Sequence, residues 1–589
     1  MKPVFFDSCL GWLHPGASSR GVVLCGPLGR EGDFTYRSWR RLAEMLSAAG
    51  LPTLRFDYRG FGDSVEEDDA PDRIAAWVGD VRQAAQWLKA TQGVQEVVLV
   101  GLRFGAAAAA AAAGELGGVQ GLAFLAPVTS GRAYHRELTI MARMGQKAPP
   151  REGEDLNVAG ITCTPQTQTD LQQFEPFRAG GLLAPRILTL TPPGMKLDRV
   201  LAGRLAGSDI DAREGEFTGY SDLMVDADFA AFPEEAFARI VDWTREGLPP
   251  APAAATVSGV NEEVQIDLTC ARERTVFLNG SSRLFAIVTE PKTRAKGGGA
   301  VVFLNTGATR HTGTGRIAVL LARRFAELGL TSLRFDLAGV GDSPDRAGQR
   351  DPVEHIADGF PDVAAALDWL ESEGYSNPLL LGFCRGAQLA CNMAFRDRRV
   401  RAQILIAPPP YFWNDEPAHR APISNRRYLN LVATPKAWKR FANGEISPLQ
   451  LMRIGARMLG RVVSKARAKV VADGVAKRLR SLKGLGVETL LLYGDSDEFL
   501  IDNEEYFSAG RKEFENRLGM TTAILSDVDH LFLEKRQRQI LTDAILRYFS
   551  EGLRLIPNQA GRANTPPLVE GAAPYAAPDS SKLSPLRQH

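Results

Sequence analysis

Short apolar runs alternate with segments of helical periodicity through much of the chain. In the second half, runs rich in Val, Leu and Phe predict strands, and segments with apolar residues every three or four positions predict helices between them. Their order is strand 300–305, helix 316–329, strand 331–336, helix 363–372 and strand 378–383. The runs carry few polar residues, which is typical of strands buried on both faces. The pattern therefore predicts a mostly parallel sheet with helices on both faces.

The same pattern occurs twice. TLRFDYRGFGDS begins at residue 53, and SLRFDLAGVGDS begins 279 positions later, at residue 332. Two more pairs follow in the same order at offsets of 282 and 281 positions, namely DVRQAAQWL (80–88) with DVAAALDWL (362–370) and VLVGLRFGAAAA (98–109) with LLLGFCRGAQLA (379–390). This spacing is far longer than the ~20–50 residues of a solenoid repeat. The chain is therefore predicted to contain a duplicated domain.

Composition sets the boundaries of the two copies. Residues 248–260 are rich in Pro and Ala and almost uncharged, which predicts a linker, and residues 556–589 are rich in Pro, Ala and Ser, which predicts a disordered tail. The first copy is expected to span residues 1–247 and the second residues 261–555.

Overall composition excludes several classes of protein. Apolar residues make up 44% and charged residues 24%, as in globular proteins. The net charge of +1 does not indicate that the chain as a whole binds nucleic acid. Six scattered cysteines without a CxxC pair argue against a disulfide framework and a zinc ribbon. No basic and apolar leader and no long apolar run occur, so we expect a cytoplasmic protein without a membrane span.

The second copy contains a motif typical of a nucleophile elbow. In Gly382-Phe383-Cys384-Arg385-Gly386, an apolar run ends, two glycines bracket one reactive residue, and a segment of small residues follows. Glycines permit a turn so tight that the central side chain stands clear of the sheet at the start of the next helix. The helix N-terminus and a nearby imidazolium would lower the thiol pKa, so Cys384 is the candidate nucleophile.

With this motif, both copies resemble the α/β-hydrolase superfamily over nearly their whole length. The segment DLAGVGDS, Asp336 to Ser343, is similar to a loop of the serine aminopeptidase-like branch. That family commonly has serine at the elbow, whereas Cys384 resembles the elbows of dienelactone hydrolases and polyhydroxyalkanoate synthases. The resemblance implies two tandem α/β-hydrolase domains, the second with a helical cap, and no metal or organic cofactor.

In this fold the nucleophile is followed along the chain by an acid and then a histidine. Of the histidines after Cys384, the resemblance assigns the catalytic position to His530, after TTAILSDVD and before a predicted helix at 540–549. The acid should follow the strand in ETLLLYGDSDEF. Family spacing indicates Asp497, and Asp495 is the alternative.

The resemblance also implies an oxyanion hole. Its donors would be the backbone amide of Arg385 and an amide of Gly307 or Ala308, in the loop after the first long strand. His311 lies in the same loop, where it either lines the pocket or belongs to a solvated loop. Asp336 is expected to be structural.

The first copy has lost these residues. Its elbow reads GLRFG, which puts Arg103 at the nucleophile position, and a guanidinium cannot attack a carbonyl. No histidine occurs between His135 and His311, so the terminal histidine is missing as well. The first copy is therefore predicted to be a degenerate domain that serves as a scaffold, a ligand-binding module or an interface.

A charged insertion follows the elbow of the second copy. Residues 411–483, the predicted cap, contain 16 Lys and Arg against 4 Asp and Glu, a local charge of +12. Charges of one sign favour an anionic partner, with Arg461, Lys465 and Lys469 as candidate contacts. An anionic membrane surface is the physical alternative.

Together, these observations predict a cysteine-dependent acyl enzyme, hydrolase or acyltransferase, that acts on an ester or thioester through an acyl-Cys intermediate. An acyl-coenzyme A or an acyl carrier protein would combine a thioester with the negative charge that the cap favours. The alternative is a catalytically silent two-domain binding or scaffold protein.

Overall fold

The structure is a computed structural model. It describes residues 1–66, 69–145, 153–158, 160–177, 184–206, 210–249, 263–280, 282–293, 299–346, 356–413, 465–507 and 518–551. Most of the predicted linker, most of the predicted cap and the predicted tail lie outside these residues. Within the described residues, no helix is both long and apolar enough to cross a membrane.

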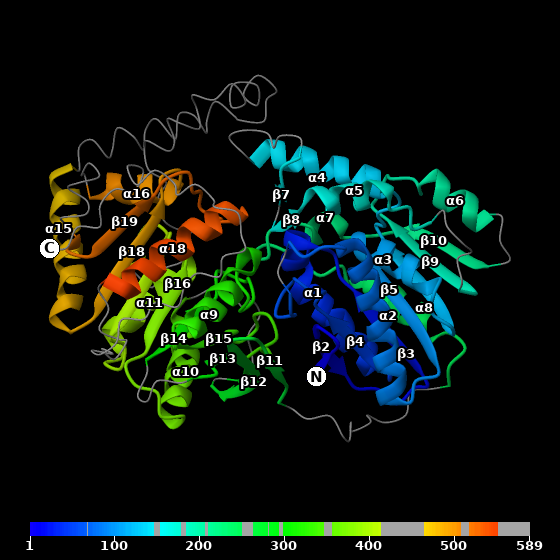
Figure 1. Ribbon diagram of the computed structural model, residues 1–589, viewed down its shortest axis with the longest axis horizontal. Helices are drawn as coiled ribbons and strands as arrows, with labels where there is room; N and C mark the ends of the chain where they lie inside the picture. Colours follow the sequence, from blue (N-terminus) through cyan, green and yellow to red (C-terminus); the bar gives the residue numbers. More distant parts are fainter. Residues whose placement is uncertain are drawn as a thin grey trace.

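Two large sheets organise the described chain, one in each copy (Figure 1). The first has the strand order β1 (Lys2–Phe6), β2 (Cys9–His14), β4 (Thr53–Phe56), β3 (Arg20–Cys25), β5 (Glu96–Leu102), β6 (Val119–Leu125), β9 (Arg186–Thr191) and β10 (Asp211–Glu216). β1 and β2 pair antiparallel and β2 pairs antiparallel with β4, whereas all later pairs are parallel. A short hairpin, β7 (Leu156–Val158) and β8 (Ile161–Cys163), lies apart from this sheet.

The second sheet repeats this plan. Its order is β11 (Gln265–Asp267), β12 (Ala271–Asn279), β13 (Arg283–Pro291), β15 (Thr331–Phe335), β14 (Ala300–Leu304), β16 (Leu379–Phe383), β17 (Ala402–Ile406), β18 (Glu488–Gly494) and β19 (Thr521–Leu525). The strands from β15 to β19 are parallel, and the first three pairs are antiparallel. The predicted mostly parallel α/β architecture is therefore confirmed in both copies.

Helices cover both faces of each sheet because successive residues of a buried strand point to opposite sides. In the first copy, α1 (Gly29–Ala48) and α8 (Glu234–Arg245) pack on one face, and α2 (Arg73–Gln92) and α3 (Phe104–Ala113) on the other. The remaining helices among the described residues of this copy are α4 (Gly131–Gly145), α5 (Pro165–Gln173), α6 (Arg199–Ala206) and α7 (Tyr220–Leu223).

In the second copy, α9 (Ile317–Glu327) and α18 (Lys535–Glu551) lie on one face of the sheet. On the other face lie α10 (Phe360–Ser372), α11 (Arg385–Arg396) and α15 (Lys465–Gly484). Short helices η1 (Thr314–Arg316) and η2 (Ile356–Gly359) precede α9 and α10, and α16 (Glu498–Tyr506) follows β18. Each copy thus has its own hydrophobic core.

The two copies match in register as well as in order. In the first sheet Val22 of β3 lies opposite Thr53 of β4, and in the second Val301 of β14 lies opposite Ser332 of β15. Val301 lies 279 positions after Val22, and Ser332 lies 279 positions after Thr53. The loop and helix between these strands therefore have the same length in both copies.

The copies contact each other through an apolar cluster and a set of buried ion pairs. Leu10 and Trp12 of the first copy pack against Ile266, Phe285 and Ile287 of the second. Around this cluster the copies exchange charged contacts in a reciprocal way. Each copy has an arginine on the strand LRF and an aspartate at the end of its GxGD loop, and each arginine pairs with the aspartate of the other copy, as Arg55 with Asp342 and Arg334 with Asp63.

All four of these side chains are buried, with exposed fractions of 2% or less. Charges removed from water are stable only when they are paired. The ion-pair partners of Arg55, Asp63 and Asp342 lie in the other copy, whereas Arg334 also pairs with Glu273 of its own copy. The interface is self-complementary in the manner of a twofold dimer, within one chain.

Candidate active site

Cys384 lies at the sharp turn between β16 and α11. Its backbone has φ +50° and ψ −115°, in the left-handed half of the map that residues with a side chain rarely adopt. The two glycines of the motif make the turn feasible. A Cβ on Gly382 would collide with the backbone of Gly386, and one on Gly386 would collide with the carbonyls of Leu304 and Asn305. The thiol is held at the start of α11 and is partly exposed.

His530 follows β19 and lies beside the thiol. Its Nδ1 is 3.2 Å and 3.1 Å from the two carboxylate oxygens of Asp497, and the ring also lies close enough to Cys384 for the thiol to raise its pKa. Phe499 packs edge-on against the imidazole, with 4.5 Å between ring centroids. The carboxylate on one side and the phenyl ring on another fix the orientation of the imidazole.

The acid that faces His530 is Asp497 and not the alternative, Asp495. Asp497 is fully buried and caps the N-terminus of α16, where its Oδ1 accepts a hydrogen bond from the Phe499 amide at 2.9 Å. Asp495 is exposed and accepts a hydrogen bond from the hydroxyl of its neighbour Ser496. The cap locks the carboxylate against the histidine, because a capping side chain has little rotational freedom left.

Electrostatics favour a charged imidazole at this position. Burial acts to lower the pKa of His530, but its interactions with Asp497 and Cys384 outweigh burial and raise the pKa to about 10. At neutral pH the ring is then an imidazolium. A histidine that already holds its proton cannot deprotonate a serine, whereas it stabilises a thiolate as an ion pair.

The predicted oxyanion donors fall on two elements. Arg385 is the first residue of α11, where backbone N–H groups point out of the helix end. Gly307 and Ala308 lie in the loop after β14, as expected. The Ala308 amide donates a 2.6 Å hydrogen bond to Oδ1 of Asp228, a residue of the first copy. This amide is therefore engaged by the other domain.

His311 does not line a pocket, and its loop is not solvated. The side chain is completely buried, with Nδ1 2.7 Å from Asp336 and Nε2 2.7 Å from Asp63 of the first copy. Burial acts to lower the pKa of His311, but the two carboxylates raise it to about 10. The sequence expectations for this residue are corrected because its second partner lies 248 positions away in the other copy.

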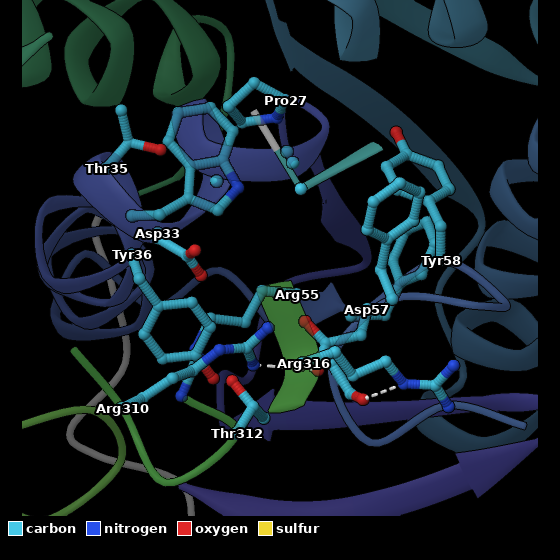
Figure 2. A pocket seen from close by; sticks show the side chains of 18 of the residues that line it. Pro27, Asp33, Thr35, Tyr36, Arg55, Asp57, Tyr58, Arg310, Thr312 and Arg316 are labelled. Atoms are coloured by element: carbon cyan, nitrogen blue, oxygen red, sulfur yellow. Dashed lines mark hydrogen bonds and ion pairs between the residues drawn. The ribbon is translucent and has the colours of Figure 1, made fainter. Parts of the chain in front are cut away.

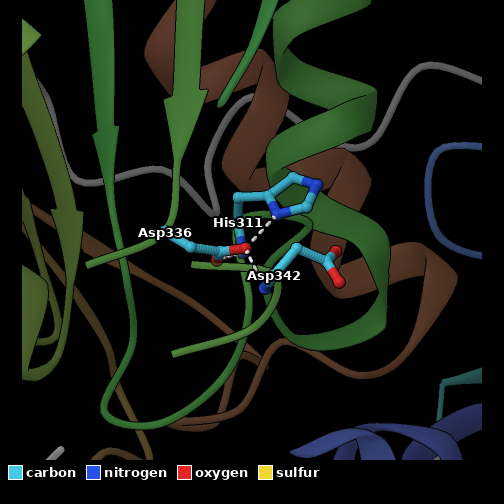
Figure 3. A group of neighbouring side chains, drawn as sticks. All are labelled: His311, Asp336 and Asp342. Atoms are coloured by element: carbon cyan, nitrogen blue, oxygen red, sulfur yellow. Dashed lines mark hydrogen bonds and ion pairs between the residues drawn. The ribbon is translucent and has the colours of Figure 1, made fainter. Parts of the chain in front are cut away.

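Asp336 is structural, as expected, and organises the loop around it. Its oxygens accept hydrogen bonds from the amides of His311 and Asp342 (Figure 3). His311, Asp336 and Asp342 approach each other closely enough to hold a metal ion. Both ring nitrogens of His311 already face carboxylates, however, and Asp342 is paired with Arg55, so the group is accounted for as an ion network.

The elbow of the first copy keeps the turn without the chemistry. Arg103 has φ +55° and ψ −117°, nearly the backbone angles of Cys384. Its guanidinium forms ion pairs with Glu31 at 2.9 Å and with Glu137 at 2.5 Å. Arg103 is thus a fixed structural cation at the position of the nucleophile.

A cavity of about 70 Å³ lies at the interface between the copies (Figure 2). The first copy contributes most of its walls, and Arg310, Thr312 and Arg316 close it from the second copy. The carboxyl of Asp33 points into it, and burial raises the pKa of this group to about 7 despite the nearby Arg310. None of Cys384, His530 and Asp497 lines this cavity, so it is separate from the candidate active site.

The predicted contacts of the cap cannot be placed. Arg461 lies outside the described residues, and so do the side chains of Lys465 and Lys469, although both residues belong to α15. Asp228 and Asp63 are the site-related residues that sequence reasoning missed. Asp63 sits in a visible repeat of the GDS sequence, but no local pattern marks Asp228.

Family models match both copies. Residues 34–175 match the model described as serine aminopeptidase, S33, and residues 301–541 match the model described as the alpha/beta hydrolase family. No curated protein matches the sequence.

Solved structures with a similar fold share little sequence with this chain. An α/β serine hydrolase homologue from Coxiella burnetii is 18% identical, with 50% of this chain and 99% of that chain covered and a TM-score of 0.28. A hypothetical protein from Pseudomonas aeruginosa is 19% identical over 49% of this chain and 95% of its own, with a TM-score of 0.32. A puromycin-hydrolyzing peptidase from Mycobacterium tuberculosis is 17% identical over 48% of this chain and 39% of its own, with a TM-score of 0.30.

Proposed function

The chain belongs to the α/β-hydrolase superfamily, with one domain in each copy, and we propose that its second domain is a cysteine-dependent acyl enzyme. One observation supports this proposal: the thiol of Cys384 stands at a strained elbow beside His530, which is held in turn by the buried Asp497. The three residues come from three different loops, after β16, β18 and β19. A merely structural cysteine does not need this arrangement.

The reaction begins with attack of the Cys384 thiolate on the carbonyl carbon of an ester or thioester. The carbonyl π-electrons move to oxygen, and the amides of Arg385 and Gly307 stabilise the negative charge that develops there. When the carbonyl re-forms, the alcohol or thiol leaves with a proton from His530. An acyl-Cys intermediate and a neutral imidazole remain.

The second half returns the enzyme to its starting state. His530 accepts a proton from water, or from another acceptor, as that molecule attacks the acyl-Cys carbonyl. The collapse of this second tetrahedral intermediate expels the Cys384 thiolate, which pairs again with the imidazolium. Hydrolysis and acyl transfer use the same three residues and differ only in the molecule that reaches the intermediate.

The charge of the predicted cap supports an anionic donor. A local charge of +12 over residues 411–483 raises the concentration of anions near the site, while the remainder of the chain carries −11. Acyl-coenzyme A and an acyl carrier protein are anionic and present a thioester. A thiol exchanges with a thioester with little change in bond energy, so charge and chemistry favour the same donor class.

Mass spectrometry of the intact protein after brief exposure to a small acyl thioester tests the proposal directly. We expect a mass increase equal to one acyl group, located on the peptide that contains Cys384 and absent from Cys384→Ala. Cys391 is an internal control, because it is fully buried and burial raises the pKa of its thiol to about 12. An unmodified Cys384 would favour the silent binding protein instead.

A further inference from the structure

The first domain contacts the loop that carries the proposed oxyanion donor. This loop, residues 305–316, connects β14 to α9 in the second domain. Within it, four residues make hydrogen bonds or ion pairs to the first domain, namely Ala308 to Asp228, Arg310 to Asp57, His311 to Asp63, and Arg316 to the backbone carbonyls of Gly62, Ser64 and Glu66. Four of the twelve residues in this stretch are therefore tied to the other domain.

The contact made by Asp228 is the one closest to the proposed chemistry. Asp228 lies between α7 and α8, and its Oδ1 accepts the Ala308 N–H at 2.6 Å. The carboxylate also lies directly against Gly307, because a Cβ built at Gly307 would collide with it. A side chain at 307 would therefore push the carboxylate away, and the positive φ of +56° at this residue also favours glycine.

The other contacts hold the far end of the loop. Arg310 pairs with Asp57 at 2.8 Å, and both side chains are 8% exposed. His311 and Arg316 are buried as well. Because buried charge-assisted hydrogen bonds are costly to break, these contacts fix the loop firmly along its length.

We propose that the degenerate first domain positions the oxyanion loop of the second, and that Asp228 is the positioning residue. By holding the Ala308 amide, Asp228 sets the orientation of the preceding peptide unit, whose Gly307 N–H is then aimed at the substrate oxygen. This inference rests on the proposed function and extends it by giving the catalytically silent copy a role in the reaction. Preorganised donors contribute to catalysis because they need no rearrangement when the oxyanion forms.

Three variants of full-length protein test the proposal. Asp228→Ala removes the acceptor, Asp228→Asn keeps an acceptor oxygen in the same place, and Asp222→Ala removes an exposed acid from α7 in the same region. Each is compared with wild type by three measurements: the rate of Cys384 acylation, the rate of Cys384 alkylation by iodoacetamide, and hydrogen exchange in peptides spanning 305–316.

Alkylation needs the thiolate but passes through no oxyanion, so it separates loop positioning from thiol reactivity. We expect Asp228→Ala to slow acylation about tenfold or more, since loss of a whole oxyanion donor costs ~100- to 1,000-fold. Its alkylation rate should match wild type, and exchange in the loop should be faster. Asp228→Asn should recover most of the acylation rate, and Asp222→Ala should match wild type throughout.

The outcomes distinguish this inference from the proposed function. Acylation of Asp228→Ala at the wild-type rate, or unchanged loop exchange, would overturn the positioning role. Faster acylation would also overturn it and would make Asp228 a block on the oxyanion donor. If wild-type Cys384 is alkylated but never acylated, the proposed function fails, and the exchange measurement still decides whether Asp228 holds the loop.

Discussion

The two elbows of the molecule have nearly the same backbone and opposite chemistry. Arg103 and Cys384 differ by about 5° in φ and 2° in ψ, and each opens a helix after a buried strand. In the second domain the side chain at this turn contacts a histidine. In the first it forms ion pairs with Glu31 and Glu137. The turn can therefore persist without catalysis when its side chain is satisfied by other partners.

The comparison extends to the loop that faces each elbow. In the first domain, Glu31 belongs to the start of α1 and its ion pair with Arg103 ties this segment to the elbow from within. In the second domain, the corresponding loop is held by residues of the first. In the first domain, the ion pair with Glu31 uses the side chain at the elbow itself. In the second domain, the loop is held by residues of the other domain, and the side chain of Cys384 is left available to react. The two elbows thus differ in how the facing loop is held, by a contact within the domain in the first copy and by contacts from the other domain in the second.

The largest effect is expected from the nucleophile itself. Cys384→Ala should lower turnover of an ester or thioester by about a thousandfold or more, because no other group is placed to form the intermediate. Cys384→Ser should keep only a small residual rate, since a hydroxyl is a smaller, harder and far less acidic group than the thiol around which the site is built. Steady-state kinetics measure both. Activity of Cys384→Ala within tenfold of wild type would exclude the mechanism.

Removal of the acid should come next in size. Asp497→Asn should lower kcat by about 100- to 10,000-fold, because the amide neither orients the imidazole correctly nor stabilises its charge. The matched control is Asp495→Asn, two residues earlier and exposed, which should leave kcat close to wild type. Equal losses in the two variants would mean that the assignment of the acid is wrong.

The pH profile tests the charged state of His530. Its raised pKa means that the ring keeps its proton at neutral pH and loses it as the pH rises through about 10. Because the leaving group needs this proton, kcat/KM should decline only above about pH 9–10. In Asp497→Asn the alkaline limb should shift to lower pH, since one of the interactions that raise the pKa is lost. A wild-type decline centred near 6.5 would contradict the ion pair.

Salt should separate donor capture from chemistry. The Debye length falls from ~10 Å at 0.1 M to ~3 Å at 1 M, so kcat/KM for an acyl-coenzyme A donor should drop severalfold across this range. A neutral ester with the same acyl group should respond little. Charge reversal at Arg461, Lys465 and Lys469 should reproduce the loss at low salt. The same salt response for both donors would show that the basic cap takes no part in donor recognition.

The smallest effect is expected at the other elbow. Arg103→Ala should leave kcat within about twofold of wild type while lowering the unfolding temperature, since removal of one partner leaves the half-buried Glu31 without its ion pair. Arg103→Cys in a Cys384→Ala background should restore no turnover. Recovered activity there would show that the first domain retains a catalytic site of its own.

Much of the fold follows from the sequence because the strands are short, apolar and repeated. β14, β15 and β16 end within one residue of the runs that predict them. Helix ends are less predictable. α10 begins three residues before the predicted helix, at Phe360, because Pro361 suits the first turn of a helix and adds no apolar periodicity.

The candidate site divides in the same way. Cys384, His530 and Asp497 could be proposed from one domain, since each follows a strand of the same sheet. His311 could not be interpreted correctly, because the charge that determines its role, Asp63, comes from the other domain. Asp228 was invisible for the same reason. Sequence patterns report neighbours within an element or a domain, and they do not report which loops meet across an interface.

The reciprocal pairing of Arg55 with Asp342 and of Arg334 with Asp63 makes the two halves of the chain poor candidates for separation. Cutting between them would leave Arg55, Asp63 and Asp342 without their ion-pair partners on newly exposed apolar surfaces, whereas Arg334 would keep Glu273 of its own copy. The duplicated units are therefore modular in sequence but not in folding. A homologous domain that replaces either half would need both the arginine and the aspartate that this half contributes to the two ion pairs. Both side chains would have to be buried to the same extent as the originals before the hybrid could assemble.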